Sequence, residues 1–293
     1  NVDDTAYLNY MDWTGINSPQ TLFLERNLMV YGDIILNNNL NVRRDTSQSF
    51  IFKDNASITS NNSSIDANFI VSPNSNSQTL KLEDNLMMSD TSGILIANGI
   101  FDTQNNDVKT GAISTINDIS STADSRTLNM GSSFVELKGR FNSDGDDDLT
   151  INPGTSHLYI GAPVQYSPDT ISVLNFLMTE GSASNPTTFY DVTLNFQTLK
   201  NLDQRIIGNN SFNKLTIVPG SSILFESGAT QTISDSLKMT GNCRDSIHIY
   251  SQIPFGSPGS SPNSFLQNDG STNAECLKID NIVVSNSVNA YFS

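Results

Sequence analysis

Residues 215–228 read LTIVPGSSILFESG, and residues 149–161 read LTINPGTSHLYIG. In each stretch a short apolar run is followed by a Pro-Gly step and a second apolar run. The two steps, Pro153–Gly154 and Pro219–Gly220, are 66 residues apart. Because proline fixes φ and glycine accepts a positive φ, such a step turns the chain between two strands. We therefore predict that both stretches form strand, corner and strand, and that the two corners have the same role.

A second repeated feature is a glycine between two apolar runs, at Gly32, Gly99 and Gly139. The first two glycines are 67 residues apart. A spacing of 66 to 67 residues divides into three turns of about 22 residues, which suits a β-solenoid in which each turn pairs with the next. The pattern predicts an all-β chain that forms a parallel β-helix or β-solenoid. A tandem β-sandwich is the alternative, because Asn98–Gly99 and Asp144–Gly145 are dipeptides typical of hairpins.

Short apolar runs separated by Asn, Ser, Gly and Asp recur along the whole chain and predict strands. The runs are 28–31, 33–36, 50–52, 69–71, 94–96, 134–137, 157–160, 215–218, 223–225, 247–250 and 282–284. A single short helix is predicted over 196–207, because Leu199, Leu202 and Ile206 have helical spacing. We expect residues 1–20 to form an N-terminal cap or linker and 21–293 the solenoid, with a division near 165–190.

The composition limits the classes of partner. The 293 residues include 30 acidic and 15 basic side chains, which gives a formal net charge of −15. This charge opposes binding to phosphate backbones, so nucleic acid is not an expected partner. No stretch approaches the roughly 18 consecutive apolar residues of a membrane span. The chain has few charged residues, and Asn, Ser and Thr take their place. These three residue types favour turns and exposed strand faces over helix interiors.

The C-terminal part of the chain resembles a known repeat family. The resemblance rests on residues 189–194 (FYDVTL), 212–233, 237–251 and 276–287, and it covers about the last 105 residues. These stretches resemble the right-handed β-helix repeats of large Bacteroidetes surface proteins. The resemblance implies a right-handed β-helix, export by the type IX secretion system, and a role in adhesion, filaments or surface display.

One acidic loop has the residue types of a calcium site. Asn142, Asp144, Asp146 and Asp148 place oxygen ligands at alternate positions around Gly145. Ca²⁺ takes six to eight oxygens, so this loop predicts a Ca²⁺ site that other residues complete. The alternative is a solvated acidic turn, and no other cofactor is expected.

The two cysteines, Cys243 and Cys276, are separated by one to one and a half of the predicted turns. An even cysteine count in a chain that resembles secreted proteins favours a disulfide between them. Two buried free thiols are the alternative.

No catalytic residue can be assigned. His157 and His248, the only histidines, each lie in an apolar alternating run, so we predict that they are strand residues rather than catalytic bases. Tyr7, Tyr10 and Trp13 form an N-terminal aromatic group that can cap an open solenoid end or stack on sugar rings or a neighbouring copy. Polysaccharide lyases and hydrolases share the β-helix, which keeps a carbohydrate-cleaving enzyme as the alternative.

These observations predict an extracellular or cell-surface β-solenoid module with a structural or adhesive, non-enzymatic role. The expected partners are other copies of the chain in a filament, or glycans and proteins of a cell surface. A carbohydrate-binding or polysaccharide-degrading β-helix protein is the alternative function.

Overall fold

The structure is a computed structural model, and it shows a β-solenoid. It describes residues 6–115, 125–143, 149–161, 176–179, 181–182, 184–196, 204–226, 228–240, 247–251, 264–268, 271–275, 277–280 and 282–286. Within these residues every paired strand is parallel to its partner and no helix occurs, so the predicted solenoid is confirmed and the sandwich is not formed. The chain divides into two compact units, which are unit 1, Asn1–Leu137 with Ser143–Ser156, and unit 2, Lys138–Asn142 with His157–Ser293.

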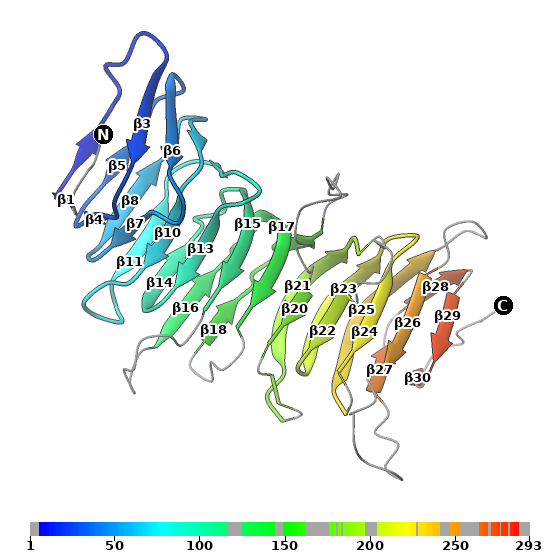
Figure 1. Ribbon diagram of the computed structural model, residues 1–293. Coiled ribbons are helices and arrows are strands. Elements are labelled where there is room, and N and C mark those ends of the chain that lie inside the picture. Colours follow the sequence, from blue (N-terminus) through cyan, green and yellow to red (C-terminus); the bar gives the residue numbers. More distant parts are fainter. Residues whose placement is uncertain are drawn as a thin grey trace. The chain divides into compact units, whose positions relative to one another are not determined.

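Unit 1 has three columns of stacked strands, here called columns A, B and C (Figure 1). Column A contains β3 (Gln20–Leu24), β6 (Leu40–Arg44) and β9 (Ser64–Ile65). Column B contains β1 (Ala6–Leu8), β4 (Leu28–Val30), β7 (Ser49–Phe52), β10 (Asn68–Val71), β13 (Gly93–Ile96) and β15 (Val108–Ser114), and β12 (Leu86–Met87) also pairs with β15. Column C contains β2 (Met11–Asp12), β5 (Ile34–Ile35), β8 (Ala56–Thr59), β11 (Thr79–Leu82), β14 (Gly99–Asp102), β16 (Arg126–Asn129) and β18 (Leu149–Asn152). Residues 6–20 thus already contribute β1, β2 and the start of β3.

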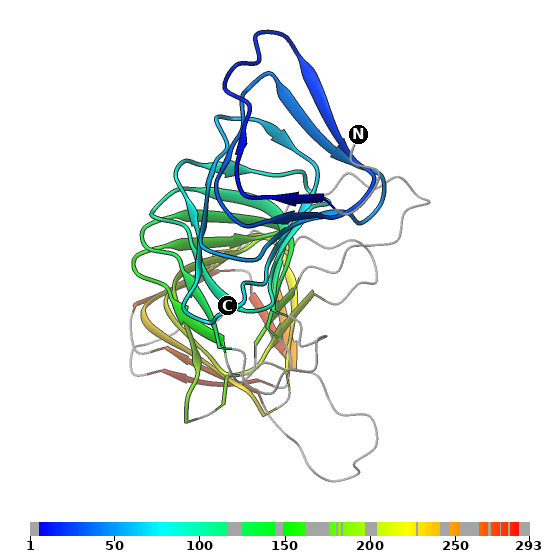
Figure 2. The same cartoon turned by 90° about the vertical axis from the view of Figure 1, so that its left-hand side faces the viewer.

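The turn length in unit 1 agrees with the predicted period. In column B, Leu28 pairs with Phe50, Phe50 with Phe69 and Phe69 with Ile94, so successive turns take 22, 19 and 25 residues. Figure 2 shows these turns following one another from blue to green. Gly32 lies between β4 and β5, and Gly99 begins β14 directly after β13. These two glycines therefore occupy equivalent corners three turns apart, as their spacing predicts.

Two other spacing predictions are wrong. Gly139 lies inside β17 (Phe134–Asn142) and not at a corner. Pro153–Gly154 and Pro219–Gly220 both make corners, but in different turns: Ser156 N donates to Pro153 O, whereas Ser221 N donates to Val218 O. Proline is therefore the first residue of one turn and the second residue of the other. Pro153 precedes β19 (His157–Ile160), whereas Pro219 follows β23 (Asn210–Ile217), which is stacked in the same column as β19, so the two corners do not stack on each other.

Unit 2 continues the parallel pattern (Figure 1). One column contains β19 (His157–Ile160), β21 (Thr187–Leu194), β23 (Asn210–Ile217), β25 (Thr230–Thr240) and β28 (Ser271–Glu275). A second contains the end of β17, β20 (Phe176–Met178), β22 (Gln204–Ile207), β24 (Ser222–Phe225), β26 (Ile247–Ser251) and β29 (Leu277–Asp280). A third pairs the start of β25 with β27 (Ser264–Asn268), which pairs with β30 (Ile282–Asn286).

Each of the eleven apolar runs contains a strand, so the strand predictions are confirmed. The predicted helix is wrong over Gln204–Ile207, which forms β22 and pairs in parallel with β20 and β24. Leu199 and Leu202 lie outside the described residues. The spacing of Leu199, Leu202 and Ile206 is that of a helix, but backbone pairing with the two neighbouring turns makes Ile206 part of a strand.

The core of each unit is a narrow stack of alternate strand residues. In unit 1, Phe50, Phe52 and Phe69 are buried, and the Phe69 ring packs edge-on against both others, with centroids 5.6 and 5.5 Å apart. In unit 2, the Phe189 ring lies 6.0 Å from that of Phe212 on the next turn. Since strand side chains alternate between the two faces, the residues between these phenylalanines point outward.

At the corners of unit 1, side-chain oxygens accept hydrogen bonds from backbone N–H groups of the neighbouring turn. The partners lie 22 to 27 residues apart along the chain, at 2.6 to 3.0 Å. The acceptors are Asn27, Asp33, Asn55, Asn68, Asp84, Asn85, Asn105 and Asp107. Each corner interrupts the strand ladder, and these bonds give the N–H groups beside it a partner on the neighbouring turn, so they hold adjacent turns together.

We predict that Asp84→Ala lowers the free energy of unfolding by about 1–3 kcal/mol, because the Asp84 carboxylate accepts from the N–H groups of both Ser60 and Asn61. Urea denaturation measures this change. Glu83→Ala is the matched control, since it removes the same charge from the adjacent exposed residue. An equal loss in the two variants would contradict the role given to Asp84.

Candidate functional site

The most distinctive surface of unit 1 is the outward side of column B. Its central outward residues are Tyr7, Met29, Ile51, Ile70 and Leu95, which pair in register from β1 to β13. We call these five residues the apolar row. Tyr7 is 70% exposed, and the other four are partly exposed although the residues on either side of each are buried. Five successive turns thus present an apolar side chain to the outside.

The outward sides of the other two columns are mostly polar, and their outward apolar residues, such as Ile100 of column C, pair with polar residues on the neighbouring turns. In column C, Lys81 pairs with Ser57 on one side and Asp102 on the other. In column A, the outward side of β6 carries Asn41 and Arg43. Among the described strands of unit 1, the run of consecutive apolar residues is therefore a property of column B alone.

The residues within two positions of each member of the apolar row, along the chain, are uncharged or basic. Asn27 and Asn68, on one flank, use their side-chain oxygens to accept from Ser49 N and Gly93 N on the next turn. On the other flank, Tyr31 stacks on Tyr7 with ring centroids 6.4 Å apart, and Lys53 Nζ donates to Ser72 Oγ at 3.1 Å. In a chain of net charge −15, the row and these flanking positions contain no carboxylate.

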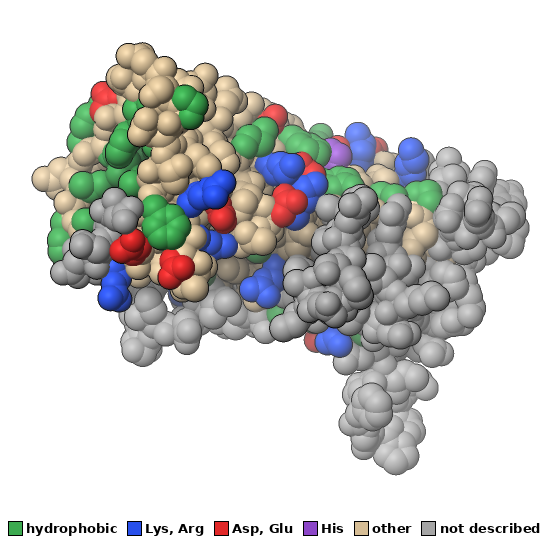
Figure 3. All heavy atoms as spheres, turned by 45° about the horizontal axis from the view of Figure 1, so that its top comes forward, with side chains coloured by type: hydrophobic (Ala, Val, Ile, Leu, Met, Phe, Trp, Pro, Cys, Tyr) green, Lys and Arg blue, Asp and Glu red, His purple; other side chains and the backbone are tan. Residues whose placement is uncertain are grey.

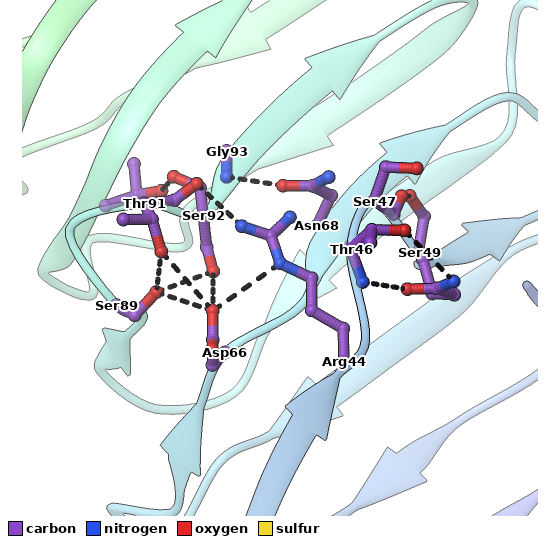
Figure 4. A network of polar contacts seen from close by, with 12 residues as sticks. Arg44, Thr46, Ser47, Ser49, Asp66, Asn68, Ser89, Thr91, Ser92 and Gly93 are labelled. Atoms are coloured by element: carbon purple, nitrogen blue, oxygen red, sulfur yellow. Dashed lines mark hydrogen bonds and ion pairs between the residues drawn. The ribbon is translucent and has the colours of Figure 1, made fainter. Parts of the chain in front are cut away.

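A polar network lies at a corner of unit 1 (Figure 4). Arg44 Nε lies 3.5 Å from Asp66 Oδ1, and Arg44 Nη2 donates to Thr91 O at 2.8 Å. The same Asp66 oxygen accepts from Ser89 Oγ and Ser92 Oγ at 2.9 and 3.3 Å. The network connects three successive turns, and the Arg44 side chain is only 10% exposed. Its geometry therefore supports a role in holding the corner together.

In unit 2, the outward side of β19, β21 and β23 carries a group of ionisable and hydroxyl side chains. His157 pairs in register with Asp191, and its Nε2 lies 2.8 Å from Thr193 Oγ1. Lys214 Nζ lies 3.9 Å from Asp191 Oδ2 and 3.8 Å from Asp235 Oδ2. The space-filling view shows a histidine at the surface with basic side chains beside it (Figure 3). Burial lowers the pKa of His157, while the Asp191 carboxylate opposes part of this shift.

This group has some of the chemistry of a carbohydrate site. A neutral imidazole beside a hydroxyl can accept a proton, and alternating charges offer hydrogen bonds to sugar hydroxyls. Tyr159 is the next outward residue of β19, and its hydroxyl accepts from Asn195 Nδ2 at 2.6 Å. No sequence signal singled out Asp191 or Thr193, because they approach His157 only through strand pairing.

The N-terminal aromatic residues do not form one cluster. Tyr7 belongs to the apolar row, whereas the Tyr10 hydroxyl donates to Asp12 Oδ2 at 3.4 Å. Thr14 N donates to Asp12 Oδ1 at 2.8 Å, and this hydrogen bond lowers the pKa of the Asp12 carboxyl. Trp13 is partly exposed.

Most of the predicted metal and disulfide residues lie outside the described part of the chain. Asn142 is the last residue of β17, but Asp144, Asp146 and Asp148 are not described, so the calcium site stays a prediction. Cys243 and Cys276 are not described either, and their disulfide stays a prediction. His157 and His248 lie in β19 and β26, as expected of strand residues.

In the described ranges, no three His, Cys, Asp or Glu side chains gather in a way that could hold a metal ion. The same residues contain no apolar helix long enough to cross a membrane. Comparisons with protein-family models, curated proteins and solved structures found no match to this chain.

We predict that the free energy of unfolding falls as the pH is lowered through 6.5, the ordinary pKa of histidine. His157 has a lowered pKa in the folded protein, so the unfolded chain binds the proton first and is favoured in this range. Denaturant unfolding at several pH values between about 7.5 and 5.5 measures the slope, with His157→Gln as the comparison. A slope unchanged in His157→Gln would show that His157 does not cause it.

Proposed function

We propose that this chain is an extracellular structural and adhesive module of a surface protein or filament, without a catalytic role. The apolar row supports this proposal, because it places outward apolar side chains on five successive turns, flanked by uncharged or basic residues, where an uncharged partner surface can bind. The parallel stack gives the row a rigid support, with neighbouring strands about 4.8 Å apart.

The resemblance to Bacteroidetes surface repeats supplies the setting of this proposal. A module of this kind, exported by a type IX system, would present the row to glycans or proteins of a cell surface, or to other copies. The loop that carries Asn142, Asp144, Asp146 and Asp148 would add a bound Ca²⁺. Cys243 and Cys276 would add a disulfide, which suits an oxidising compartment.

The experiment compares adsorption of the full chain to uncharged alkyl-coated and sugar-coated sensor surfaces. Ile51→Lys places a charge at the centre of the row, and we expect it to weaken adsorption about tenfold or more. Ile100→Lys is the matched control, because Ile100 is an outward isoleucine inside column C, paired with Thr79 and Thr127. Equal adsorption by the two variants would overturn the proposal.

A carbohydrate-binding or carbohydrate-cleaving role is the second candidate, and the group around His157 favours it. The His157 and Thr193 contact and the neighbouring charges of Asp191 and Lys214 are suited to sugar hydroxyls or uronic carboxylates. Release of reducing ends from neutral and acidic polysaccharides, lost in His157→Gln, would support this role. Absence of both release and glycan binding in the wild-type chain would exclude it.

A further inference from the structure

We propose that the apolar row is a contact between two copies of this chain, packed face to face. This inference rests on the proposed adhesive function and names the partner as a second copy. Three properties support it: the charge of the chain, the geometry of the row and the size of the contact.

The charge of the chain favours the outward side of column B as the face for self-association. Two copies of net charge −15 repel each other, and the repulsion is strongest where carboxylates approach closely. The outward side of column C would bring residues such as Asp102 against their equivalents, whereas the apolar row and the residues that flank it carry no carboxylate. A second copy therefore meets less repulsion at the outward side of column B than at that of column C.

The geometry of the row suits pairing with itself. Its five side chains follow the strand spacing of about 4.8 Å, so the row is roughly 19 Å long. Two identical rows have the same spacing, so the side chains of one can fit between those of the other at the usual sheet-to-sheet distance of about 10 Å. A two-fold axis close to the central residue, Ile51, but offset from it by about a quarter of the strand spacing, interleaves the two rows and places Tyr7 of each copy near Leu95 of the other.

The size of the contact sets its strength. The strip is roughly 19 Å long and three residues, or about 10 Å, wide, so its area is roughly 190 Å². This area is well below the roughly 800 Å² per partner of a standard stable interface. We therefore expect weak, concentration-dependent pairing of the isolated chain. Many copies held on one surface or filament would strengthen such a contact through their high local concentration.

Sedimentation velocity of the full chain, at about 10 µM to about 1 mM protein in about 0.15 M salt, tests the proposal. At this salt concentration the Debye length is about 8 Å, so repulsion between distant charges of the two copies is screened. We expect the weight-average sedimentation coefficient of the wild type to rise with concentration. Ile51→Lys and the milder Ile70→Thr should remain monomeric, while Ile100→Lys should behave as the wild type. Melting curves show that each variant is folded.

A wild type that stays monomeric up to 1 mM would overturn the proposal, as would association of Ile51→Lys equal to that of the wild type. The adsorption experiment separates this failure from failure of the adhesive function. If Ile51→Lys still reduces adsorption while the wild type stays monomeric, the row binds a different surface. If adsorption is unchanged as well, the row has no adhesive role.

Discussion

The structure of unit 1 depends on hydrogen bonds that pass from one turn to the next at the corners. Parallel strands satisfy their own backbone groups through the ladder, but each corner interrupts the ladder and leaves N–H groups without partners. Asn and Asp are short enough for a side-chain oxygen to reach the neighbouring turn. Asn55, for example, accepts from Thr79 N at 2.9 Å, and Asn68 accepts from Gly93 N at 3.0 Å. This use explains why so many Asn, Ser and Asp residues separate the apolar runs.

The same requirement shapes the surface. Side chains at the corners are engaged in bonds between turns, including the network of Arg44 and Asp66. The outward strand residues do not have to make these bonds between turns, so their residue types can differ from one column to another. Column C carries mostly Thr, Ser, Lys and Asp there, with isolated isoleucines such as Ile100, whereas column B carries five apolar residues in succession. The proposed contact function follows from this difference between columns.

The sequence was sufficient for the fold class and for most strands. Apolar runs bounded by polar clusters identified the strands. The spacing of Gly32 and Gly99 gave the turn length, because at both corners the backbone comes very close to the preceding turn. A Cβ at Gly99, which has φ +75°, would lie 2.8 Å from Gln78 O. The Pro-Gly comparison failed because two different turn types share one dipeptide. The helix over 196–207 failed because the spacing of Ile206 suits a helix as well as a strand, and pairing with β20 and β24 decided between them.

The apolar row was missed, although the sequence carried a signal. Phe50-Ile51-Phe52 and Ile94-Leu95-Ile96 are unbroken apolar runs, whereas Leu80-Lys81-Leu82 has a polar middle residue. The middle residue points outward in each case, so the repeated unbroken runs indicated an apolar outer surface. The group around His157 had no such signal, because pairing between turns brings Asp191 and Thr193 to His157 across 34 and 36 residues of sequence.

Native-state hydrogen exchange tests the central claim most directly. The amides of Ser60, Thr79 and Gly93 donate to side chains of a neighbouring turn rather than to a strand. If the corner bonds hold the turns together, these three amides exchange as slowly as the interior amides of β10 and β11, such as those of Ile70 and Lys81. Exchange at the rate of unprotected amides would show that the corner bonds do not hold the turns together.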